Sequence, residues 1–118
     1  MAEPLRRQLS ADLRAAMKAK DTIAVAALRS VLSALDNASA VPMESVAASA
    51  FGRNDDVPRR DLSGADCQNI IRAEISARAA AAEEYVRLGR DAEAARLRAE
   101  QAIVERYAAR TADERVRT

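Results

Sequence analysis

The sequence predicts an all-α protein: a four-helix, up-down bundle-like domain of two helical hairpins, with a long loop between the second and third helices. Three observations support this prediction. Apolar and small residues recur at helical spacing through most of the chain, alanine makes up about a quarter of it, and only three glycines and three prolines interrupt it. With 118 residues, the chain is expected to form a single helical domain over 1–118.

The first hairpin is expected from helices near residues 4–19 and 22–38. Leu5, Leu9 and Leu13 recur along one face of the first helix. Asp21 can cap the second helix by accepting a hydrogen bond from an early backbone N–H. No glycine or proline separates the two helices, so a single long bent helix remains an alternative.

The segment 40–62 is predicted to be a long flexible loop, because it holds two prolines, one glycine and a cluster of charged residues. Inside it, residues 42–51 have the spacing of a short helix that could dock as a lid through Phe51. A mobile linker fits the same composition, and the sequence leaves both alternatives open.

The third helix is expected near residues 64–88. Ser63 and Asp66 have the spacing of a capping box, in which the hydroxyl accepts from an early backbone N–H and the carboxylate reaches back to the start of the helix. Apolar and small residues then follow at helical spacing as far as Leu88.

Gly89 and Arg90 form the predicted turn of the second hairpin, because glycine readily takes the left-handed conformation that commonly ends a helix. A fourth helix near residues 92–108 follows the turn. Residues 109–118 are predicted to be a disordered tail.

The chain has no histidine and a single cysteine. These counts exclude a zinc site of His and Cys ligands within one chain, and also Ser-His-Asp and Cys-His nucleophilic sites. Glu83, Glu84 and Glu100 are candidates for acid–base chemistry. Glu83 and Glu84 are adjacent in a helix and point about 100° apart, so they cannot act as a facing pair on one bond. A solvated face is the simpler interpretation of these glutamates. Cys67 is interpreted as a small core residue. We therefore predict no catalytic residue, no metal and no cofactor.

The overall charge is close to balanced, with 19 basic and 18 acidic residues and a net charge of +1. A nucleic-acid site would therefore have to be a local basic patch. The sequence has no apolar run of membrane-spanning length and no signal-peptide core, so we expect a cytoplasmic protein that does not bind membranes.

Two basic features could form such a patch. The first is a stripe along the first helix with further cations close by in sequence, and it supplies the candidate RNA-binding residues Arg7, Arg14, Lys18, Lys20 and Arg29. Asp12 and Asp21 lie in the same region and could neutralise part of it, so an ordinary solvated face is the alternative. The second feature is the pair Arg59 and Arg60 in the long loop.

Four motifs follow one another in the order and spacing of a known family. They are Asp12–Asp21 (DLRAAMKAKD), Leu28–Leu35 (LRSVLSAL), Glu74-Ile75 with Arg78, and Gly89-Arg90 followed by Ala94-Ala95 and Glu100. In this order the chain resembles the GatB/YqeY family over about three quarters of its length. The helical domain of that family also forms the tail of the B subunit of the glutamine-dependent aminoacyl-tRNA amidotransferase.

The resemblance implies a helical accessory that associates with tRNA or with a tRNA-amidating complex and is not catalytic by itself. The family is linked to carbon–nitrogen ligase activity, but that chemistry lies in other domains of the amidotransferase. Family members typically continue from a Tyr-Leu-Pro step into a further small helical domain, whereas here Tyr107 is followed by Ala108-Ala109. The alternative function is a helical interaction module, unrelated to RNA, that binds a protein partner or forms a homo-oligomer.

Overall fold

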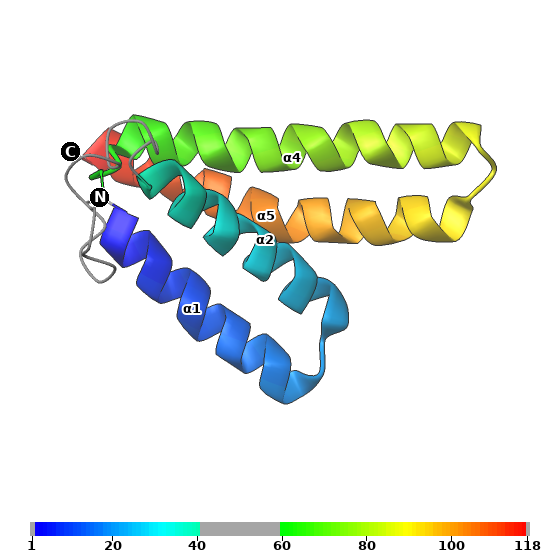
Figure 1. Cartoon of the computed structure of the whole chain (residues 1–118), viewed down its shortest axis with the longest axis horizontal. Coiled ribbons are helices and arrows are strands. Elements are labelled where there is room, and N and C mark those ends of the chain that lie inside the picture. Colours follow the sequence, from blue (N-terminus) through cyan, green and yellow to red (C-terminus); the bar gives the residue numbers. More distant parts are fainter. Residues whose placement is uncertain (1, 41–59, 118) are drawn as a thin grey trace, which may run out of the picture.

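The structure is a computed structural model that describes residues 2–40 and 60–117. These residues form four helices and no strand: α1 (Ala2–Ala19), α2 (Thr22–Ser39), α4 (Gly64–Arg87) and α5 (Asp91–Arg117) (Figure 1). The predicted all-α fold of two helical hairpins is therefore confirmed. Most of the predicted 40–62 loop, including the possible short helix over 42–51, lies outside the described residues.

The break between α1 and α2 is made by Lys20, which adopts a left-handed conformation with φ of 60°. The backbone N–H of Lys20 donates to the Met17 carbonyl (3.1 Å) and that of Asp21 donates to the Ala16 carbonyl (2.9 Å), the hydrogen-bond pattern of a Schellman motif. The Asp21 carboxylate then accepts from the backbone N–H of Ala24 (3.1 Å) and caps α2. Two helices are confirmed, and the single bent helix is wrong, because a left-handed residue ends α1 without glycine or proline.

The second hairpin follows its predicted caps. Ser63 and Asp66 form a complete capping box at the start of α4. Gly89, with φ of 74°, ends α4 in the same hydrogen-bond pattern that Lys20 makes at the end of α1. Glycine tolerates this conformation because it has no Cβ.

The last helix differs from its predicted bounds. It begins at Asp91 and continues to Arg117, whereas the sequence predicted an end near residue 108 and a disordered tail over 109–118. The physical reason is that residues 108–117 contain no glycine or proline to stop a helix and include several good helix formers.

The two hairpins differ in length and cross at an angle (Figure 1). In the shorter hairpin, α2 packs against both α4 and α5, while α1 packs mainly against α2. The turn of the α4–α5 hairpin projects beyond this contact, and Val86 and Leu88 there are 52% and 61% exposed. The hairpin root is therefore well covered and its tip is not.

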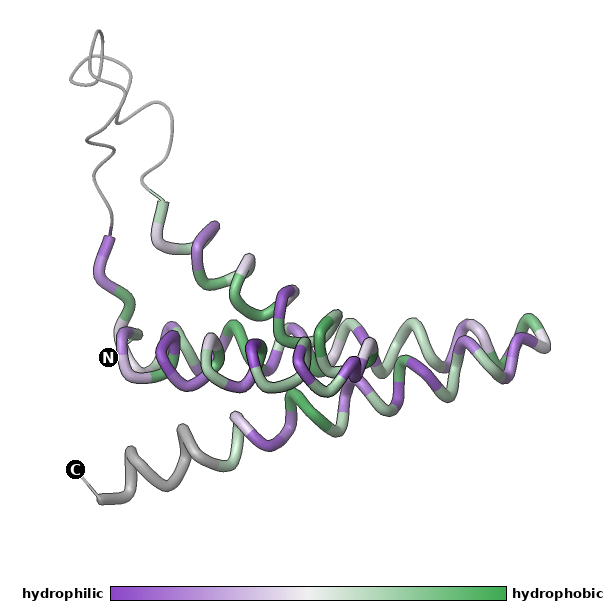
Figure 2. The backbone as a smooth tube through the Cα atoms, turned by 90° about the horizontal axis from the view of Figure 1, so that it is seen from below, coloured by the Kyte–Doolittle hydropathy of each residue, from purple (hydrophilic) through white to green (hydrophobic). Residues whose placement is uncertain are grey.

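The core lies where the hairpins meet. Its largest fully buried side chains come from all four helices: Leu9, Val31, Leu35, Ile71 and Val104. Figure 2 shows hydrophobic and hydrophilic positions alternating along each helix, as expected when a helix buries only one side. No helix in the described part of the chain is long and apolar enough to cross a bilayer.

Candidate nucleic-acid interface

The predicted basic stripe is exposed along one face of α1. Leu9 and Ala16 are buried on the opposite side of this helix, against the rest of the bundle. Arg7, Arg14 and Lys18 follow each other at spacings of seven and four residues and are all exposed. None of the three forms an ion pair within the described part of the chain. Their charges are therefore directed away from the core.

The two nearby acids that could have neutralised the stripe make other contacts. Asp12 accepts a hydrogen bond from Gln8 (2.9 Å) and another from the Tyr107 hydroxyl of α5, so its carboxylate lies on the packed side of α1. Asp21 caps α2. The solvated-face alternative rested on these two residues, and neither carboxylate is paired with a stripe residue in the described part of the chain.

The other two predicted RNA-binding residues follow the stripe: Lys20 lies in the turn between α1 and α2, and Arg29 lies on α2. Both are exposed and both line a shallow groove of about 630 Å³ at that turn. Met17, Thr22, Val25 and Ala26 complete its lining. The structure thus brings the five predicted RNA-binding residues to one hairpin: three along α1 and two at the groove that follows it. We call these five residues the basic face.

The other predicted cations do not join the basic face. Arg59 lies outside the described residues. Arg60 donates from its side chain to the Ala38 carbonyl (3.4 Å) and from its backbone N–H to the Ser39 carbonyl (2.7 Å). At the opposite hairpin turn, Arg90 pairs with Glu93 (2.9 Å) and lies over the Tyr85 ring, 5.5 Å from its centroid. The Arg90 side chain is therefore committed to contacts within its own turn.

The contacts at this turn also lower the pKa of Glu93. A hydrogen bond from its own backbone N–H, and then the Arg90 guanidinium, hold the pKa of Glu93 below its usual value. The carboxylate lies in the first turn of α5, where the helix dipole also favours negative charge. The turn carrying Gly89 and Arg90 is therefore a structural feature rather than part of a basic patch.

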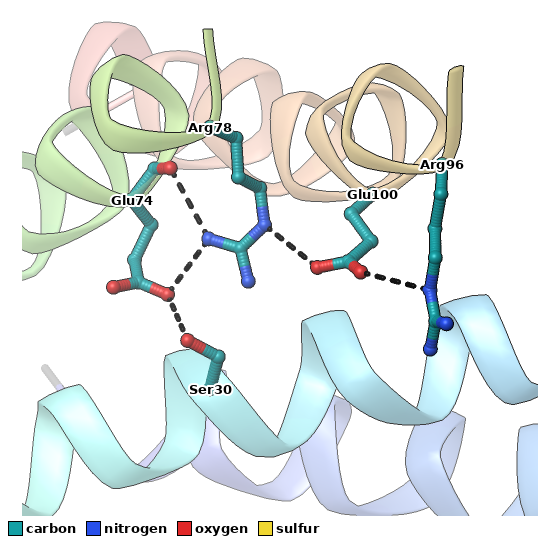
Figure 3. Close-up of polar contacts among 5 residues, drawn as sticks. All are labelled: Ser30, Glu74, Arg78, Arg96 and Glu100. Atoms are coloured by element: carbon teal, nitrogen blue, oxygen red, sulfur yellow. Dashed lines mark hydrogen bonds and ion pairs between the residues drawn. The ribbon is translucent and has the colours of Figure 1, made fainter. Parts of the chain in front are cut away.

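Sequence reasoning missed a buried charged network where α2, α4 and α5 meet (Figure 3). Arg78 is at its centre, with its side chain only 9% exposed. Its guanidinium donates to the Glu74 carboxylate (3.0 Å) and to the Glu100 carboxylate (3.2 Å). Ser30 of α2 donates to Glu74 (2.5 Å), and Arg96 lies 3.7 Å from Glu100. The two negative charges are matched by two positive ones, so the network holds the helices together rather than presenting a net charge.

The solvated-face interpretation of Glu100 is therefore wrong: this residue is 8% exposed. Glu83 and Glu84, by contrast, are exposed. A signal was present in the spacing, because Glu100 precedes the buried Val104 by one helical turn, and Arg78 lies seven residues after the buried Ile71. A pattern of apolar positions alone does not reveal that these two charged residues lie on the buried side of their helices.

Arg6 makes contacts with the end of α2 that the sequence did not predict. Its guanidinium donates to the Leu35 carbonyl (3.2 Å) and to the Ser39 hydroxyl, and it lies 3.5 Å from the Asp36 carboxylate. These groups are at the C-terminal end of α2, where the helix dipole favours a cation. Arg6 therefore anchors α1 to α2 and is not available to the basic face.

Chemically reactive groups are sparse in the described part of the chain. Cys67 is 2% exposed, which confirms it as a core residue, and burial raises the pKa of its thiol. No group of three or more acidic or cysteine side chains among these residues is placed to hold a metal ion.

Comparison with known proteins identifies a protein family. A family model described as Yqey-like protein matches residues 6–117 of the chain. No curated protein and no solved structure matches at a significant level. The match spans all four helices and includes the whole basic face, and it agrees with the resemblance drawn from the four sequence motifs.

Proposed function

Because the chain belongs to the YqeY-like family, we propose that it is a non-catalytic accessory domain that binds tRNA through the basic face and serves glutamine-dependent aminoacyl-tRNA amidation. The amidation link rests on the family resemblance to the amidotransferase tail. The RNA contact has a second support, which is the arrangement of charges on the α1–α2 hairpin.

One observation carries the proposal: five exposed cations share one hairpin, and neither of the acids near them, Asp12 and Asp21, pairs with any of the five in the described part of the chain. Phosphate groups are bound by such local clusters even when the net charge of the chain is close to zero. The proposal assigns no catalytic residue. Glutamine hydrolysis and carboxyl activation would be carried out by other polypeptides.

The test is the salt dependence of tRNA binding, measured by fluorescence anisotropy at several salt concentrations. If four of the five cations contact phosphates, the slope of log K against log salt should be roughly −3 to −4, from about 0.7 to 0.9 per contact. Replacing Arg14 and Lys18 by glutamine should reduce the size of this slope by about 1.4 to 1.8.

A matched control is available on the other hairpin. Arg72 and Arg98 are exposed, and neither forms an ion pair within the described part of the chain. Replacing both by glutamine changes the net charge by the same amount and should leave the slope unaltered. Equal loss in both double variants would mean that binding follows net charge alone, and the basic face would then be only a solvated surface.

A protein-interaction module is the second candidate function. The specific observation in its favour is the uncovered tip of the α4–α5 hairpin, where Val86 and Leu88 are 52% and 61% exposed. Binding to a polypeptide or to a second copy through this tip would weaken little with salt, because burial of apolar surface releases no counterions. Absence of any salt-dependent tRNA binding, together with association that Leu88→Glu abolishes, would favour this function.

A further inference from the structure

The groove at the α1–α2 turn has a composition that the phosphate contacts do not explain. Its lining combines two cations, Lys20 and Arg29, with the apolar side chains of Met17, Val25 and Ala26 and one hydroxyl, that of Thr22. Phosphate binding alone would need the cations but no apolar surface. Met17 is 49% exposed, so this flexible and polarizable side chain is free to contact a ligand.

Two other clefts in the described part of the chain are less suited to an anionic ligand. One, of about 300 Å³, is lined by two acids, Asp12 and Asp21, and one cation, Arg106. The other, of about 580 Å³ at the hairpin roots, is lined by two acids and by two cations, Arg6 and Arg60, so its charges balance. The groove at the α1–α2 turn has two cations and no acidic lining residue. Among the three, only this groove has a lining with a net positive charge.

The ligand that fits this lining has a flat, weakly polar part and an attached negative charge. We propose that the groove holds one unstacked nucleotide of an RNA loop, with its base on Met17 and Val25 and its phosphates near Lys20 and Arg29. This inference rests on the proposed tRNA binding and adds to it the class of RNA that is recognised. The rest of the loop's backbone would run along Arg14 and Lys18, which are exposed on α1 and precede the groove residue Lys20 in the sequence.

The backbone at this turn supports the assignment. Lys20 holds a left-handed conformation that glycine adopts at lower cost, and Gly89 takes that position in the other hairpin. Residues held in such sparsely populated backbone conformations are often found at binding sites, and Lys20 lines the groove. A contact between the Lys20 ammonium group and a ligand would offset the free-energy cost of this left-handed backbone conformation.

The proposal also separates loop RNA from duplex RNA. A duplex presents phosphates and sugars on its outside while its bases stay paired and stacked, so it can use the cations but leaves the apolar surface unfilled. A loop can turn one base outward onto such a surface, and burial of the base against apolar side chains adds affinity with little dependence on sequence. The groove therefore predicts a preference for unpaired RNA.

The test compares two RNA probes with equal numbers of phosphates: a hairpin with a seven-nucleotide loop and a blunt duplex. The wild-type chain should bind the hairpin roughly fivefold to tenfold more tightly, which is the gain expected if the base and the groove remove about 40–55 Å² of apolar surface from water. Met17→Gln, which keeps the size of the side chain but makes it polar, should remove this preference without altering duplex binding. Met17→Leu should retain it, and a 2-aminopurine in the loop should change its fluorescence with wild type and Met17→Leu only.

The outcomes distinguish this inference from the function on which it rests. Salt-dependent binding of both probes with less than a twofold preference, or a preference that survives Met17→Gln, overturns the groove assignment and leaves tRNA binding intact. No salt-dependent binding of either probe overturns both. Displacement of the hairpin loop by a short peptide of glutamate and leucine, at concentrations where polyglutamate of equal charge has no effect, would assign the groove to an acidic protein partner instead.

Discussion

Replacing Arg78 by methionine would remove the centre of the buried charged network and leave two carboxylates facing each other across α4 and α5. Breaking a buried ion pair typically costs about 3–5 kcal/mol of stability, mostly because the remaining charge loses its partner. The side chains of Glu100 and Glu74 are 11% and 19% exposed, so solvent screens them little. Glu100 keeps Arg96 at 3.7 Å and Glu74 keeps the hydrogen bond from Ser30, which places the expected loss at the low end, about 3 kcal/mol.

Urea denaturation followed by circular dichroism measures this loss directly. The midpoint should fall while the m-value stays constant, since the variant buries a similar surface. In a thermal scan, about 3 kcal/mol corresponds to a decrease in Tm of roughly 12 °C for a chain of this size. Arg87→Met is the matched control on the same helix: its pair with Glu84 is exposed, with side chains 71% and 56% accessible, and should be worth at most about 0.5 kcal/mol.

A loss below about 1 kcal/mol for Arg78→Met would refute the reasoning, because it would mean that the network is screened like a surface pair. A second variant tests the cause of the loss. Replacing Arg78, Glu74 and Glu100 together by methionine removes the charges along with their pairing, and such whole-network replacements are often close to neutral. We expect this triple variant to be more stable than the single one. A triple variant that is less stable would show that the ion pairs themselves are net stabilising.

Three further predictions concern the helix ends. Gly89→Ala should cost about 1 kcal/mol in urea denaturation purely through the left-handed backbone, because an added Cβ would meet no atom within 4 Å; a loss near zero would mean that the turn relaxes. Lys20→Gly should do the opposite, stabilising the fold by about 0.5–1 kcal/mol while weakening tRNA binding, and tighter binding would contradict the role given to this lysine. At the start of α4, the Ser63 backbone N–H and then its hydroxyl lower the pKa of Asp66 below 3.8. The carboxylate therefore contributes stability above that pH, and this contribution is lost as the pH falls through the lowered pKa. Urea midpoints of Asp66→Asn measured from pH 6 to 2 should show a shallower acid loss than wild type, and identical slopes would contradict this.

Local chemistry explains why most of the fold was predictable from sequence. Three helix ends each depend on a few neighbouring residues: the capping box of Ser63 and Asp66, the cap at Asp21 and the left-handed Gly89. All three features lie where the sequence predicted them. The left-handed Lys20 was not predicted, because lysine has no preference for that conformation. The C-terminal end of α5 was misplaced because no local stop signal exists between residues 108 and 117.

The candidate interface was predictable only in part, because side-chain partners are decided by tertiary contacts. Helical spacing placed Arg7, Arg14 and Lys18 on one exposed face. It could not show that Tyr107, 95 residues away in sequence, donates to Asp12 and holds that acid on the packed side of α1. For the same reason Glu100, which is buried at the helix junction beside Arg78, was interpreted from the sequence as part of a solvated face.

The sorting of charges on the first hairpin links the fold to the proposed interface. Residues 2–29 carry six basic and three acidic side chains. None of the three acids pairs with a residue of the basic face in the described part of the chain, and Glu3 lies 3.9 Å from Arg6 instead. Arg6 and Asp12 face the other helices and contribute tertiary contacts, Asp21 caps a helix, and the remaining cations are left on the outer side. A chain with a net charge of +1 can therefore present a positive surface, because the cations of this hairpin outnumber its acids and those of the basic face form no ion pair with them. Since binding and folding then use opposite sides of α1, substitutions on the outer side can change RNA affinity while leaving stability nearly constant.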